Sequence, residues 1–85
     1  MLYMSTYEIT PETRNAVQKR FMETGGPPPE GVTMLGRWVT PGGKGFCVSE
    51  SDDIVLVAKW LQEWSDILPF EIFPIMTDEQ YSEIL

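Results

Sequence analysis

Two sequence features most constrain the fold of this chain. They are the order of the predicted strands and helices, and the apolar character of both faces of the strands. Hydrophobic period and turn residues divide it into strand, helix, strand, strand, helix and strand. In the first strand, residues 2–9, apolar and aromatic side chains fall on both parities, as in a strand buried on both sides. Two helices cover only one face of such a sheet. The other face therefore needs a second copy or a ligand to cover it.

Two helices are predicted from capping signals and apolar spacing. The first extends from the residue after Thr10, its expected N-cap, to the residue before Gly25. The second is expected to begin at a cap formed by Ser51 or Asp52 and to end near Ser65.

A hairpin is predicted between the two helices. Residues 32–40 and 45–50 have strand character, and they flank the loop Pro41–Lys44, whose proline and glycines are typical of a turn. A four-residue loop places Thr40 opposite Gly45. This register predicts one shared face for Leu35, Arg37, Val39, Phe46, Val48 and Glu50.

The last predicted strand covers residues 68–76. Pro69 and Pro74 cannot donate hydrogen bonds to a neighbouring strand, so we expect this strand at a sheet edge. Thr77 and Gln80 have the spacing of a capping box, which predicts a short C-terminal helix. This helix has an apolar stripe, and we expect it to dock against protein.

These elements predict an α+β, ferredoxin-like βαββαβ fold with a four-stranded antiparallel sheet of order 4-1-3-2 and both helices on one face. We expect a single domain, residues 1–85. A chain of this length buries only about 60–65% of its unfolded surface. A homodimer joined through the helix-free sheet faces would supply the missing core.

Charge and cysteine content limit the partners and the compartment. Thirteen acidic and six basic residues give a net charge of −7, which repels nucleic acid and anionic membrane surfaces, so neither is an expected partner. A single cysteine, Cys47, excludes an internal disulfide and favours a reducing compartment. The first residues show no signal-peptide pattern, and we expect a cytoplasmic protein.

The search for catalytic chemistry mostly eliminates candidates. The chain has no histidine, which removes Ser-His and Cys-His nucleophile pairs and histidine-ligated zinc and haem, and no cofactor or metal is expected. Glu50, Asp52 and Asp53 form an acidic cluster, but their place before a helix favours capping over cation binding. Trp60 and Trp64 are spaced as core residues of the second helix.

Arg37 is the one candidate that this elimination leaves, because a charge in the middle of a strand cannot be buried without a partner. Glu50 is the expected structural partner, and a bound anionic ligand is the alternative. Glu71 would reach Arg37 only across a dimer, and Tyr3 and Tyr7 would add phenolic hydroxyls to the same inter-sheet cavity. These five residues are the candidate ligand-binding set.

Several segments together resemble a small uncharacterised bacterial family of short dimeric α/β-barrel proteins. The resemblance covers nearly the whole chain and rests on Met1-Leu2-Tyr3-Met4, Leu35-Gly36-Arg37-Trp38, Glu50-Ser51-Asp52-Asp53, Trp60 with Trp64, and Phe70-Glu71-Ile72-Phe73-Pro74-Ile75. It implies two ferredoxin-like sheets facing each other around a cavity. The architecture is similar to that of antibiotic-biosynthesis-type monooxygenases, muconolactone isomerases and chlorite dismutases, although this chain lacks the histidine that would ligate haem.

Three interpretations of function stay open. The first is a homodimer that binds a small, partly apolar or anionic molecule in the inter-sheet cavity. The second is a cofactor-independent enzyme of the monooxygenase or isomerase kind, and the third is a non-catalytic protein-interaction module. A cavity of about 300 Å³ or more with converging polar groups would favour ligand binding, and a filled interior would favour protein interaction.

Overall fold

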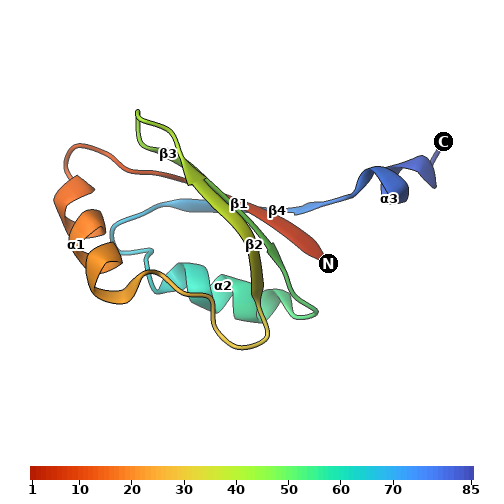
Figure 1. Cartoon of the computed structure of the whole chain (residues 1–85), viewed down its shortest axis with the longest axis horizontal. Coiled ribbons are helices and arrows are strands. Elements are labelled where there is room, and N and C mark those ends of the chain that lie inside the picture. Colours follow the sequence, from red (N-terminus) through yellow and green to blue (C-terminus); the bar gives the residue numbers. More distant parts are fainter.

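The computed structural model describes all residues from Met1 to Leu85 as a twisted sheet with two helices on one side and a third helix at the end of an extended arm (Figure 1). The elements, in chain order, are β1 Leu2–Glu8, α1 Arg14–Thr24, β2 Thr33–Val39, β3 Lys44–Glu50, α2 Ile54–Gln62, β4 Phe70–Ile75 and α3 Asp78–Ser82. No helix combines the length and the apolar character needed to cross a bilayer.

The sheet has four strands in the order β2-β3-β1-β4, and read from the β4 edge the same order is 4-1-3-2. All neighbouring strands are antiparallel, so the predicted α+β class and antiparallel sheet are confirmed. β4 pairs only with β1 and forms one edge, as its prolines predict.

The predicted hairpin register is wrong by one residue. The backbone N–H of Thr40 donates to the carbonyl of Lys44 at 2.7 Å, which leaves Pro41, Gly42 and Gly43 as the loop. Arg37 therefore faces Cys47, and Trp38 faces Phe46. A one-residue change moves every side chain of β2 to the opposite face. An irregularity between Met34 and Gly36, where Leu35 is the unpaired extra residue, shifts the pairing again.

The helix starts also differ from prediction. Residues 11–13 form a separate turn, and the Thr10 hydroxyl bonds to the Thr13 hydroxyl at 3.0 Å instead of capping the helix. In α2 the cap is Asp53, whose carboxylate accepts from the Val55 N–H at 2.9 Å. The buried Ser51 hydroxyl donates to the Gly31 carbonyl at 2.8 Å and accepts from the Asp53 N–H at 3.1 Å, so it bonds to the capping residue instead of to the helix itself.

The core lies between the sheet and α2. It consists of five buried side chains that pack together, from β1, β3, α2 and the residue before β2: Tyr3, Val32, Cys47, Val57 and Trp60. Burial alternates along β1 and β3, with the odd-numbered residues facing this core. We call this side of the sheet the helix-side face and the other side the open face.

The C-terminal arm, residues 76–85, leaves the sheet in line with β4 and does not pack on the body (Figure 1). The predicted capping box is confirmed, since Thr77 accepts from the Gln80 N–H and the Gln80 side chain accepts from the Thr77 N–H. The docking expected for this tail does not occur within the chain, because the arm lies beyond the end of the sheet.

Candidate functional site

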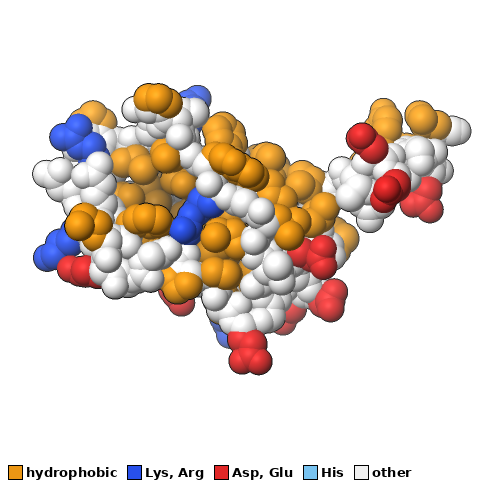
Figure 2. Space-filling view, viewed as in Figure 1, with side chains coloured by type: hydrophobic (Ala, Val, Ile, Leu, Met, Phe, Trp, Pro, Cys, Tyr) orange, Lys and Arg blue, Asp and Glu red, His pale blue; other side chains and the backbone are white.

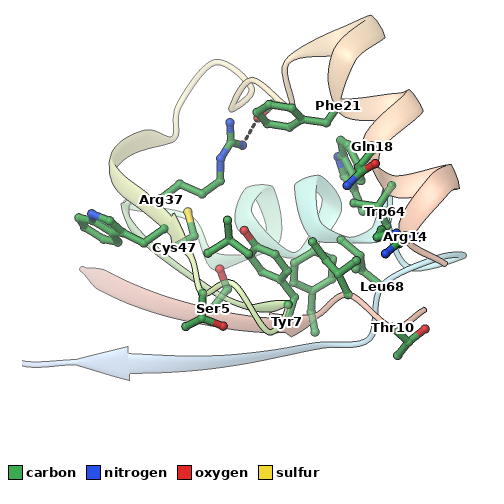
Figure 3. Close-up of a pocket in the computed structure, with 18 of the residues that line it drawn as sticks. Ser5, Tyr7, Thr10, Arg14, Gln18, Phe21, Arg37, Cys47, Trp64 and Leu68 are labelled. Atoms are coloured by element: carbon green, nitrogen blue, oxygen red, sulfur yellow. Dashed lines mark hydrogen bonds between the residues drawn. The ribbon is translucent and has the colours of Figure 1, made fainter. Parts of the chain in front are cut away.

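A cleft of about 680 Å³ lies between α1 and the helix-side face of the sheet (Figure 3). α2 fills one half of this face, while α1 stands away from the other half (Figure 1). The cleft is lined mainly by apolar and aromatic side chains from both helices and the sheet, among them Tyr7, Val17, Phe21, Cys47, Trp60, Trp64, Leu68 and Phe70.

Arg37 projects from β2 into this cleft toward the C-terminal end of α1 (Figure 3). Its guanidinium donates to the carbonyl of Gly26 at 2.7 Å and to the carbonyl of Gly25 at 2.9 Å. The same group lies 5.0 Å from the centre of the Phe21 ring, within the range of a cation–π contact. Arg37 therefore links the central sheet to the end of α1.

The two glycines make this link possible. Gly25 and Gly26 both have left-handed backbone conformations, with φ of 74° and 55°, which turn the chain sharply after the helix. A Cβ atom on Gly26 would lie only 2.9 Å from the terminal nitrogen of Arg37 and 3.4 Å from the Trp64 ring. A side chain at this position would displace the guanidinium.

Tyr7 forms the floor of the cleft together with Cys47. The Tyr7 ring lies over Gly45 of the neighbouring strand, where a Cβ atom would overlap it, and it packs against Phe70 with ring centres 5.6 Å apart. Burial raises the pKa of Tyr7, and the nearby Arg37 guanidinium partly offsets that rise. Burial also raises the pKa of the Cys47 thiol, again against the effect of Arg37.

The charge of the cleft is opposite to that of the chain. Its lining contains two arginines, Arg14 and Arg37, and no aspartate or glutamate, although acids outnumber bases thirteen to six in the sequence. Figure 2 shows a basic group surrounded by apolar surface, with acidic groups gathered at the far end of the body and on the arm. The one ion pair of the molecule joins Arg20 to Asp66, so Arg37 has no carboxylate partner.

The structure brings together only part of the residue set predicted from the sequence. Tyr7 and Arg37 meet in the cleft, and Tyr3 lies on the same face but inside the core. Glu50 and Glu71 are exposed and belong to the open face, because they pair with Leu2 and Thr6 of β1, respectively. The expected contact between Arg37 and Glu50 is therefore wrong, and its cause is the register of the hairpin.

Sequence reasoning missed the contribution of α1. Phe21, Gln18 and Gly26 line the cleft, but they are distant from Arg37 in sequence and no motif connects them. One available signal was the pair of glycines after an N-terminal helix, because a tight helix end exposes carbonyl groups that a guanidinium can bind.

One family model matches the chain. It is described as a domain of unknown function, DUF3303, and it covers residues 1–85, so the protein belongs to this family. Searches of curated proteins and of solved structures returned no match.

Proposed function

We propose that this protein binds a small organic anion with an apolar body in the cleft between α1 and the sheet. The observation that carries the proposal is the lining, which has two guanidinium groups and no carboxylate in a chain of net charge −7. This charge arrangement favours an anion over a cation or a neutral molecule.

Arg37 is the proposed anchor for the anionic group. The guanidinium has five N–H donors in a planar fork, and its bonds to the carbonyls of Gly25 and Gly26 do not use all of them. A bound carboxylate would also neutralise a charge that has no acidic partner in the chain. Tyr7 lies on the same face and can donate its hydroxyl hydrogen, since a tyrosine phenol is protonated at neutral pH.

The walls suit the apolar part of such a ligand. Binding sites for small molecules typically have volumes of about 300–1,000 Å³ and mainly apolar linings, and the cleft, at about 680 Å³, lies inside this range. Phe21 and Trp64 face the cleft from the helix side, and Tyr7 faces it from the sheet. These ring surfaces favour an aromatic acid over a straight-chain one.

Calorimetric titration with four probes tests the proposal: benzoate, octanoate and the two corresponding amides. We expect both acids to bind, benzoate more tightly than octanoate. Each amide should bind at least about tenfold more weakly than the corresponding acid. Arg37→Met should abolish acid binding, and Arg37→Lys should retain a reduced affinity because it keeps the charge without the fork.

Lys19→Met is the charge-removing control, because Lys19 is exposed on α1 and lies outside the cleft lining. It removes the same charge and should leave the affinity for the acids unchanged. Equal affinity for acids and amides, or equal loss of binding in the Lys19 and Arg37 variants, would refute an anion site at Arg37.

We also propose a homodimer that forms through the open faces of two sheets in a reducing compartment such as the cytoplasm. The observation behind it is a set of large apolar side chains on β2 and β4, including Trp38, which is 58% exposed, and Phe73. Trp38 lies flat across Gly36 of the same strand, so its ring widens the apolar surface.

Light scattering at micromolar concentration tests this second proposal, with twice 9.7 kDa as the expected mass. Trp38→Glu should shift the mass to that of the monomer, and Lys19→Glu on the exposed side of α1 should not. A wild-type chain that stays monomeric throughout would refute the dimer.

A further inference from the structure

The C-terminal arm, residues 76–85, ends in an apolar surface that nothing in the chain covers. Tyr81 is 52% exposed, Ile84 is 67% exposed and Leu85 is 88% exposed. We propose that this arm docks on the open face of a second copy of the chain, near the exposed side chains of β2. This inference rests on the dimer proposed above and adds a specific occupant for the arm.

The first argument is the stability of α3. A helix of five residues is far below the length of about 12–15 residues that makes an isolated helix even marginally stable in water. Its complete capping box specifies where the helix begins, but caps contribute only about 1 kcal/mol each. Burial of Tyr81 on the helix and of Ile84 and Leu85 just after it against protein would supply the missing stabilisation.

Second, acidic side chains gather where the arm leaves the chain's own body. The hollow between α3 and the end of the sheet is lined by three glutamates, Glu50 from β3 and Glu79 and Glu83 from the arm, together with Met1, Leu2, Thr77 and Gln80. Folding the arm back would bring these carboxylates together. The arm instead points away from the body, as Figures 1 and 2 show.

The third argument is the size of the sheet. Strands of six or seven residues give an open face of roughly 24 by 19 Å, or about 450 Å², from strand rise and spacing. A stable specific interface buries about 800 Å² on each partner. The footprint is a flat projection and understates the accessible area of the face, and an arm from each copy would add further apolar area to the contact.

Position on the sheet selects the docking surface. The arm leaves from the β4 edge at the level of Thr33, since Ile75 pairs with Leu2, Leu2 with Glu50 and Glu50 with Thr33. Leu35 is exposed on β2 near this end of the opposite edge. When two identical open faces meet about a two-fold axis, the contact repeats reciprocally, so each arm can cover the partner's β2 edge.

Mixed dimers test the proposal by paramagnetic relaxation. One population, Ser82→Cys with Cys47→Ser, has a nitroxide label on the arm and no isotope, and the other has ¹⁵N and Cys47→Ser without a label. We expect amide signals of β2 in the ¹⁵N copy to lose intensity. A label at Lys19→Cys on α1 is the matched control and should leave these signals unchanged.

Substitutions in the arm give a second measurement. Ile84→Asn should raise the dimer dissociation constant at least about tenfold in sedimentation, whereas Ser82→Asn in the same arm should change it less than about twofold. If the wild type is a dimer but no β2 signal is lost, the arm proposal is wrong and the dimer stands. If the wild type is monomeric, both proposals fail.

Discussion

The two helices on the helix-side face differ in how they are held. α2 contributes Val57, which is fully buried, and Trp60 to the core. α1 contributes only Val17 as a buried residue, and its Phe21 is 47% exposed. α2 is attached by packing, while α1 is held largely by polar bonds at its end.

Sequence composition explains this difference. α2 reads IVLVAKWLQ and has an apolar stripe wide enough to enter the core. α1 reads RNAVQKRFMET, with few apolar residues, so it gains little from approaching the sheet. The cleft therefore exists because one of the two covering helices is too polar to close it.

The largest expected effect on stability comes from removing Trp60, which α2 contributes to the core. Trp60→Ala should lower the free energy of unfolding by about 3–5 kcal/mol, because it leaves a large cavity in the core. Phe21→Ala, the matched aromatic change in α1, should cost less than about 1.5 kcal/mol. Urea unfolding measures both, and equal losses would contradict the difference between the helices.

The next effect should come from the bond between the sheet and α1. Arg37→Met removes the donors to the carbonyls of Gly25 and Gly26, and we expect a loss of about 1–2 kcal/mol. Hydrogen exchange should become faster in α1 and stay unchanged in α2. Uniformly faster exchange in both helices would show that Arg37 supports the whole fold instead of α1 alone.

A smaller effect on folding stability should appear at alkaline pH, and it comes from Tyr7 and Cys47 on the floor of the cleft. Burial raises the folded-state pKa of Cys47 above 9.0 and that of Tyr7 above 10.0. The folded chain therefore holds these protons more tightly than the unfolded chain. Stability is fully present below these ordinary values and falls as the pH rises through the folded-state values.

Urea midpoints between about pH 8 and about pH 11 measure this decline. Tyr7→Phe should flatten the slope above the ordinary tyrosine pKa, while Tyr81→Phe on the exposed arm should leave it unchanged. A slope identical in the wild type and the Tyr7 variant would show that the hydroxyl is not protected by burial.

The smallest effect is expected at the second polar link of α1. Arg20 makes two bonds of 2.7 Å to Asp66 and lies 5.5 Å from the centre of the Trp64 ring. Arg20→Met should lower the melting temperature less than Arg37→Met does, because this pair is solvent-exposed and screened. Added salt should reduce the difference in melting temperature between the wild type and Arg20→Met.

Acid should also reduce the difference in melting temperature between the wild type and Arg20→Met, because Arg20 holds the pKa of Asp66 below its ordinary value of 3.8. This contribution is present above the ordinary carboxylate pKa and is lost as the pH falls through the lowered value. A melting temperature independent of both salt and acid would contradict an electrostatic link.

Much of the fold was predictable because local signals were strong. The edge position of β4 followed from its prolines, and the start of α3 followed from Thr77 and Gln80. The hairpin register was not predictable, because a loop of three or four residues fits Pro41–Lys44 equally well. That single uncertainty moved Arg37 from the open face to the helix-side face.

The sequence by itself determined the element order, the net charge and the presence of an arginine in the middle of a strand. Only the tertiary structure decided what Arg37 contacts, since its acceptors lie on backbone that is more than ten residues away in the chain. It also decided that no aspartate or glutamate lines the cleft and that the C-terminal arm does not pack on the body. Local preferences act within a few residues, whereas a site depends on which distant surfaces meet.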